Sequence, residues 1–180
     1  MKSSEIKAAL YNWAVSALPD TNWSVVFANQ NAPSPNRPYV TLRLFARQDI
    51  GEPYFEAPDE YGVAVWGKDR EASISVQVFG ENQGDMDVTE DLFDSLHKET
   101  VRTFMLRAGG LVFVGHLTGI TDLSGLMGNG IEPREQFDIR VRTAVEIEDD
   151  VGLIERVELT TVFKGEAGET VYQAVDTIGD

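Results

Sequence analysis

Apolar and polar residues alternate with a period of two in several segments of the chain, which is the pattern of a β-strand with one buried face. The clearest segments are residues 39–44, 71–79, 136–147 and 153–163. In the second of them, Ala72, Ile74 and Val76 would lie on one face, with Ser73 and Ser75 on the other. We therefore predict a sheet that is buried on one side and wet on the other.

The last two of these segments are long and lie close together in the sequence. Residues 136–147 and 153–163 each span about eleven residues, whereas a usual strand has about five to six. Residues 148–152 are acidic and end in glycine, so we predict that they close a long C-terminal β-hairpin. Such a hairpin would project beyond its own domain or build a sheet shared between subunits. Residues 165–180 predict an extended C-terminal arm, with a short strand at 170–175.

Two segments have the 3.6-residue period of an amphipathic helix. In residues 4–18, Ile6, Leu10 and Trp13 fall on one face. Residues 86–107 carry a broader apolar stripe, with acids at their start and arginines at their end, which suits the helix dipole. Helices and strands do not alternate regularly, so we predict an α+β fold. It would be an antiparallel or mixed β-sheet flanked by two main helices, with the long hairpin at the C-terminus.

One connection is stiffened by prolines. Between the strands predicted at 25–27 and 39–44, Pro33, Pro35 and Pro38 fix φ and remove three backbone donors. This segment therefore cannot form a ladder, and we predict an ordered loop.

A second connection, residues 49–60, contains a glycine, two prolines and several acids, which predicts a loop. The aromatic residues Tyr54 and Phe55 are expected to be exposed on it, between the acids Glu52 and Glu56. Two interpretations stay open. The segment is either an ordinary surface loop with one hydrophobic anchor or a contact arm for a neighbouring subunit.

Composition narrows the class of protein. A length of 180 residues favours a single domain over residues 1–180. The 30 acidic residues outnumber the 15 basic ones, for a net charge of −15, which argues against a sequence-reading nucleic-acid binder. Two interpretations of the acidity stay open. It either keeps the protein soluble, or it lines a channel through which DNA passes without binding. The chain has no cysteine, which excludes disulfides, zinc ribbons and cysteine nucleophiles. No signal peptide or membrane span is found, so we expect a soluble, unexported protein.

Candidate chemistry is sparse. The two histidines, His97 and His116, lack cysteine partners and the carboxylate spacing of a metal site, so we expect structural roles for both. The sequence contains neither a nucleophile elbow nor a phosphate-binding glycine motif. We therefore predict no catalytic residue, no metal and no cofactor. A small-molecule enzyme with an active site outside the known motifs is the least favoured alternative.

Two blocks of sequence resemble the phage neck and tail terminator family. They are residues 30–44, QNAPSPNRPYVTLRL, and residues 119–159. The resemblance implies an α+β subunit that assembles as a ring, usually of six copies, where the tail tube meets the head connector. It implies a structural virion protein, assembled in the host cytoplasm, that stops tube polymerisation and also meets the sheath in contractile phages. Double-stranded DNA would pass through the ring without specific binding. The family supplies no cofactor and no catalytic residue.

A different structural protein of the same particle stays open as an alternative, either a head–tail adaptor or a tail tube subunit. A tube subunit would polymerise into open stacks, whereas a terminator would stop at one ring.

The hairpin carries the first candidates for a subunit interface. Arg140 and Arg142 lie on its polar face, where they would meet acids of a neighbouring copy. The alternative is that they pair within the sheet, with Glu155 or Glu158. We expect Tyr54 and Phe55 to be further interface residues.

Candidates for a channel or partner-facing rim are acidic. They are Asp149 and Asp150 in the predicted hairpin turn, together with Glu52 and Glu56. Paired carboxylates in a turn are usually solvated, and at a channel wall they would offer phosphates no counterion-releasing partner.

Overall fold

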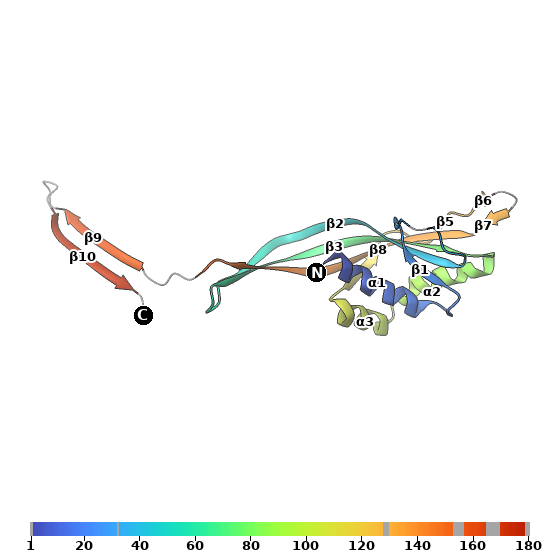
Figure 1. The fold of residues 1–180 in the computed structure, drawn as a ribbon, viewed down its shortest axis with the longest axis horizontal. Coiled ribbons are helices and arrows are strands. Elements are labelled where there is room, and N and C mark those ends of the chain that lie inside the picture. The colour runs from blue at the N-terminus through green and yellow to red at the C-terminus, as the bar shows by residue number, and fades with distance from the viewer. Residues whose placement is uncertain (1, 32, 128–129, 153–156, 165–169, 179–180) are drawn as a thin grey trace. The chain divides into compact units, whose positions relative to one another are not determined.

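The computed structural model describes residues 2–31, 33–127, 130–152, 157–164 and 170–178. Figure 1 shows the elements along the chain, which run α1 (Ser3–Ala17), β1 (Ser24–Phe27), β2 (Tyr39–Glu56), β3 (Val63–Phe79), the 3₁₀ turn η1 (Gln83–Met86), α2 (Asp87–Ser95), α3 (Glu99–Gly109), β4 (Val112–His116), β5 (Thr121–Asp122), β6 (Gly125–Met127), β7 (Gly130–Glu132), β8 (Arg134–Asp150), β9 (Val157–Lys164) and β10 (Thr170–Ile178). They fall into two compact units, residues 1–54 with 67–146, and residues 55–66 with 147–180.

The main sheet has the strand order β1-β2-β3-β8-β4, and β5 pairs with β8 beside β4. β1 runs parallel to β2 and pairs only with Tyr39–Leu42, while β4 and β5 run antiparallel to β8. The predicted α+β class and the mixed sheet are therefore confirmed.

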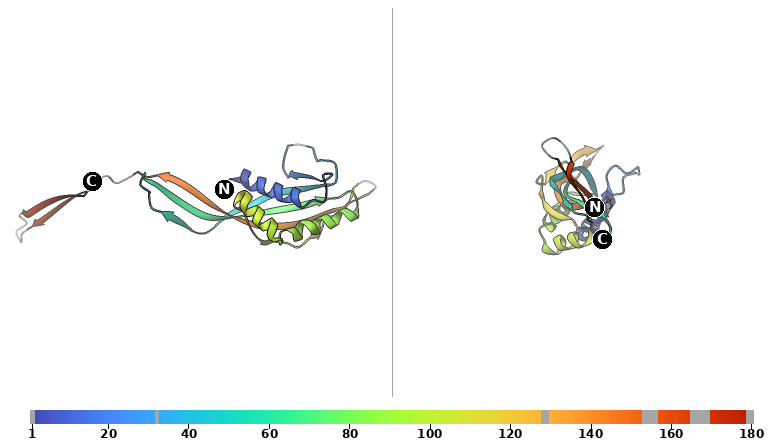
Figure 2. Two further views of the ribbon diagram at one scale, coloured as in Figure 1. Left: turned by 90° about the horizontal axis from the view of Figure 1, so that it is seen from below. Right: turned by 90° about the vertical axis from the view of Figure 1, so that its left-hand side faces the viewer.

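The helices α1, α2 and α3 all cover the same face of this sheet, as Figures 1 and 2 show. Between the two layers, Leu10, Ile74, Leu92 and Phe137 are completely buried. Burying a side chain of this size stabilises a fold by about 1.5–3 kcal/mol. The completely buried Trp13 also bonds across the helix layer, because its indole Nε1 donates to Ser95 Oγ at 3.0 Å. The apolar faces of the helices and of the strands thus pack together in one core.

The prediction of one helix over residues 86–107 is wrong, because the chain breaks it into α2 and α3. At the break the hydrogen bonds tighten to a three-residue spacing. His97 N donates to Asp94 O and Lys98 N donates to Ser95 O, both at 3.0 Å. α3 then starts afresh, with Val101 N bonded to Lys98 O at 3.1 Å. The sheet is accordingly covered by three α-helices in the described residues, and not by two.

The C-terminal hairpin exists, but other segments form it. β9 pairs with β10 in antiparallel register, from Val157 opposite Ile178 to Lys164 opposite Thr170. The predicted partner, β8, instead lies between β3 and β4 in the main sheet. The strand predicted at 170–175 is confirmed as part of β10.

The prediction of a loop over residues 49–60 is also wrong for its first part, since β2 continues to Glu56. Gly51 sits in this strand with φ of 71°, a backbone conformation that glycine adopts without strain. The glycine-rich residues 118–133 contain short strands, including the antiparallel pair β6–β7.

The second unit has its own close contacts. Phe55 and Trp66 lie with their ring centroids 4.6 Å apart. Val151 N donates to Gly62 O at 3.1 Å, and a Cβ on Gly62 would lie 2.7 Å from the backbone of Gly152. Only glycine allows these two chain segments to approach so closely.

Two further points concern the whole chain. The grouping of residues 1–180 into one domain, with 165–180 as an arm, stays a prediction. None of the helices in the described residues has both the length and the apolar character that a membrane crossing requires.

Candidate assembly surfaces

The face of the main sheet that the helices leave open carries a charged cluster. Glu71 on β3 is only 6% exposed, and it faces two arginines of β8. Arg142 Nη2 donates to its Oε1 at 2.8 Å, and Arg140 Nη1 lies 3.5 Å from its Oε2. The hydrogen bond from Arg142 is the main cause of a lowered pKa for the Glu71 carboxyl, which is therefore ionised near neutral pH.

The two arginines thus pair within the sheet, but with an acid that the sequence did not single out. Of the two partners named as alternatives, Glu155 lies outside the described residues. Two guanidinium groups face one carboxylate, so the cluster keeps a net positive charge. The Arg140 and Arg142 side chains remain 37% and 42% exposed. They are accordingly available to a second partner.

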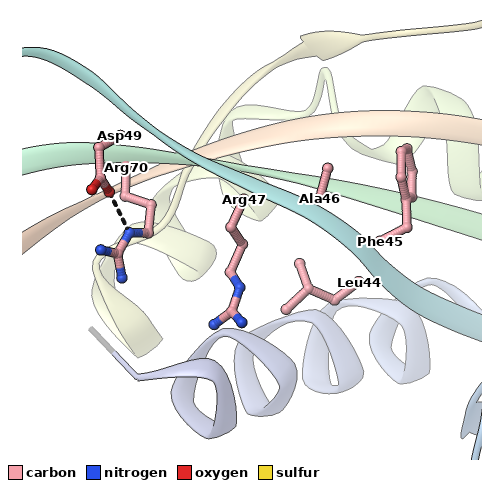
Figure 3. Close-up of a pocket in the computed structure, with 6 residues that line it drawn as sticks. All are labelled: Leu44, Phe45, Ala46, Arg47, Asp49 and Arg70. Carbon is pink, nitrogen blue, oxygen red and sulfur yellow. Dashed lines mark hydrogen bonds and ion pairs between the residues drawn. The ribbon is translucent and has the colours of Figure 1, made fainter.

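Further groups on the open face extend this surface along β2 and β4. Arg43 is exposed, and no ion pair is recorded for it in the described part of the chain. Phe45 is 47% exposed, and Figure 3 shows its ring pointing away from α1, whereas Leu44 points toward the helix. Val112, opposite Arg142 in the register, is 45% exposed.

Near the β1 end, the same face is closed by stacked side chains. The rings of Tyr39 and Phe79 lie 4.5 Å apart and nearly parallel. Arg134 lies over the Phe79 ring at 4.9 Å, and its Nη2 donates to Gln77 Oε1 at 2.7 Å. The side chains at this end of the face therefore pack against one another, whereas Arg43 is exposed.

A hollow of about 510 Å³ lies beside β2 (Figure 3). Its lining residues are Leu44, Phe45, Ala46, Arg47, Asp49 and Arg70. Arg70 Nε donates to Asp49 Oδ1 at 2.6 Å, and Lys68 Nζ lies 2.6 Å from Oδ2. Arg70 first, and then Lys68, lower the pKa of Asp49 to about 2. A carboxylate held ionised in this way is a poor general base, so the hollow shows no catalytic arrangement.

Tyr54, one of the predicted interface residues, lies in β2 and not on a loop. It is 43% exposed, and its hydroxyl donates to Glu146 Oε1 at 3.1 Å. Its ring lies against Gly67, where an added Cβ would come within 1.8 Å of the ring carbon Cζ. The glycine therefore makes room for the tyrosine.

The other candidates are exposed. Phe55 in the second unit is 51% exposed although it touches Trp66. Glu52 in the first unit is exposed, as are Glu56, Asp149 and Asp150 in the second. Their assignments to an interface or a rim stay predictions.

The histidines pack among aromatic rings in the first unit. The ring of His116 stacks on that of Phe93, with the centroids 3.5 Å apart. The ring centroid of His97 lies 5.1 Å from that of His116. Burial, and then the nearby His97, lower the pKa of His116. In the described residues, no three potential ligands are grouped so that they could hold a metal ion.

Sequence reasoning missed Glu71, Phe45 and Arg43 as parts of one surface. The alternation placed Arg43 on a polar face, but it did not show that β8 lies next to β3. That adjacency brings Glu71 to the two arginines, and it depends on strand order, which alternation does not encode.

Comparison with known proteins gives a family. Residues 4–166 match the family described as phage neck terminator protein, which confirms the resemblance seen in residues 30–44 and 119–159. No curated protein matches the sequence. Among solved structures, the chain is similar to the sheath/tube terminator of an extracellular contractile injection system, PVC, in its extended state. The TM-score is 0.54 at 10% identity, over 92% of this chain and 65% of that one, less than two thirds of its length. This likeness is one of fold.

Proposed function

Because the chain belongs to the phage neck terminator family, and is thus a structural protein of the virion neck that terminates a tail, we propose that six copies form a closed ring. The ring ends the tail tube, joins it to the head connector and meets the sheath where the tail is contractile. It assembles in the host cytoplasm, and double-stranded DNA passes through it without specific binding. The family match over residues 4–166 is the observation that carries the proposal.

The charge of the chain supports the passage of DNA. A net charge of −15 gives the phosphates few partners from which binding could release counterions. We propose that Asp149 and Asp150, with Glu52 and Glu56, face this channel or its rim. All four are exposed, which a rim position requires. A cryo-EM map of the assembled ring with these four acids on its outer wall would rule this out.

A role without catalysis fits the ionisable groups that are described. Asp49 is held by two cations, and Glu71 by two arginines. Groups bound in this way serve as counter-ions. We therefore propose that the protein has no enzymatic activity.

Native mass spectrometry across protein concentration, with and without the cognate tube protein, tests the ring. We expect a discrete hexamer, alone or on tube ends, that does not grow further. Stacks that lengthen with concentration would contradict the proposal and identify a tube subunit. A monomer that ignores the tube would also contradict it, in favour of a head–tail adaptor.

Arg140 and Arg142 are proposed interface residues in this ring, as are Tyr54 and Phe55. Reversing both arginine charges would also place two negative groups beside the buried carboxylate of Glu71. A loss of assembly in that variant would therefore not separate the interface from the fold. Tyr54→Ala and Phe55→Ala, tested singly for hexamer formation with unfolding curves as the control, avoid this difficulty.

A further inference from the structure

We propose that the open face of the main sheet binds the acidic surface of α2 in a second copy of this chain, so that copies associate head to tail. The inference rests on the proposed ring and names the two surfaces that would form its repeated contact.

The open face has the composition of an interface. Arg140 and Arg142, whose side chains are 37% and 42% exposed, share this face with Arg43 and Phe45 of β2 and with Val112 of β4, which lies opposite Arg142; these last three are exposed. Arginine and aromatic residues are enriched at protein interfaces, where apolar groups pack beside a few charged hydrogen bonds. The helices α1, α2 and α3 lie on the other face of the sheet, as Figures 1 and 2 show.

The surface of α2 carries the opposite charge. Its exposed acids are Asp87, Glu90, Asp91 and Asp94, and no ion pair is recorded for any of them within the described ranges. Asp87 and Glu90 lie in the first turn, where they stabilise the positive end of the helix dipole. Asp91 lies at the centre of α2, and Asp94 lies in its last turn, where a negative charge is unfavourable. Helix stability therefore does not explain these last two acids.

The two surfaces lie on opposite sides of the first unit. α2 belongs to the helix layer, and the arginines lie on the face of the sheet that this layer leaves open (Figure 1). Two different complementary surfaces on opposite sides of one subunit make a head-to-tail contact, and such contacts close into a ring when the rotation between copies allows it. A symmetric pair, in which one patch meets itself, would bring the arginines against one another.

Charge complementarity favours a second copy as the occupant. The arginine surface is a positive region on a chain of net charge −15, and every copy also supplies the acids that match it. Such a pattern steers association and fixes its orientation.

Charge reversal on each side, followed by both together, tests the contact. Arg43→Glu changes the open face at an exposed residue that stays outside the Glu71 cluster. Asp91→Lys with Asp94→Lys changes α2 and improves its match to the helix dipole. Lys7→Glu, at an exposed lysine of α1, makes the same change of charge away from both surfaces and is the matched control for the change at Arg43. The association of copies is measured by native mass spectrometry on tube ends and in free solution, with circular dichroism for the fold.

We expect each single-side variant to weaken ring association about tenfold to a hundredfold. The combined variant should recover part of this loss, because the reversed charge at position 43 again meets an opposite charge, whereas Arg140 and Arg142 do not. The Lys7→Glu control should assemble like the wild type. Rings that form normally in both single-side variants would overturn this contact while leaving the proposed function intact, as would losses that the combination does not repair. If Arg43→Glu abolishes tube binding but not rings, the face binds the tube protein, and the proposal is wrong. A wild type that never forms a ring would instead refute the proposed function itself.

Discussion

The two faces of the main sheet are built from the same strands but do different work. On the covered face, Ile74 and Phe137 are completely buried against the helix layer. On the open face, Glu71 is held by Arg140 and Arg142, whose side chains stay more than a third exposed. The comparison teaches that alternation in one strand can serve two purposes. The residues of one face pack inside the subunit, and the residues of the other stay partly exposed and available to a partner.

The largest expected effect is on the covered face. Phe137→Ala removes a completely buried ring that lies edge-on to Phe93 at 5.3 Å, and the loss should be about 3–5 kcal/mol in the free energy of unfolding. Urea unfolding followed by circular dichroism measures it. Arg43→Ala on the open face is the control and should stay within about 0.5 kcal/mol. Similar losses in the two variants would break the comparison.

The Glu71 cluster tests whether the open face also contributes to the fold. Glu71→Gln removes the charge that holds Arg140 and Arg142, and should cost about 1–3 kcal/mol at pH 7. Because the pKa of Glu71 is lowered in the folded state, its contribution is present above the ordinary pKa of glutamate and is lost as the pH falls through the folded value. The wild type and the variant should therefore converge in acid, as urea midpoints from pH 7 to pH 2 would show. A constant gap would indicate a packing effect.

A smaller effect is expected within the helix layer. Ser95→Ala leaves the buried Trp13 indole without its acceptor, which should cost about 1 kcal/mol. The near-ultraviolet circular dichroism of the tryptophan should change with it, while ring assembly should not. An unchanged midpoint would mean that the bond adds nothing to the packing of α1 on α2.

The smallest expected effect is the contribution of His116, on the covered face, to the pH dependence of stability. Burial and His97 lower the pKa of His116, whereas a bond to the Phe93 backbone and the charge of Asp94 oppose the shift. The unfolded chain thus binds a proton more readily, so stability is present above about pH 6.5 and declines as the pH falls through the folded pKa. His116→Phe, which keeps the stack on Phe93, should flatten this decline between pH 7 and pH 5. Thermal midpoints measure it, and an equally steep decline in the variant would exclude His116 as the cause.

Alternation predicted the strands and their buried faces well. Val40, Leu42, Ile74, Val76 and Phe137 all lie in the core, as the period of two requires. The family could also be predicted from two blocks of sequence. Residues 30–44 lie in the first unit, and residues 119–159 extend from the first unit into the second. Strand partners could not, since a period of two says which face is buried but not which strand lies alongside.

The misplaced boundaries have physical causes. Residues 86–107 contain neither proline nor glycine at the break, so the sequence gives no strong signal for a helix end there. Pro53 suggested a loop, yet it is tolerated in β2. β1 pairs only with Tyr39–Leu42, which leaves that side of β2 without a recorded strand partner further along. The open-face surface could not be assembled from the sequence, because it joins residues from four strands, β2, β3, β8 and β4.

The short edge strand β1 affects where a further strand could pair with the main sheet. Its four residues, Ser24–Phe27, end the sheet, and a segment with three prolines follows them. β1 itself offers few free amides to a passing strand, and the prolines offer none. Beyond Leu42, however, β2 continues to Glu56 with no recorded strand partner on that side in the described residues. Strand pairing at this edge of the sheet would therefore involve β2 beyond Leu42 and not β1.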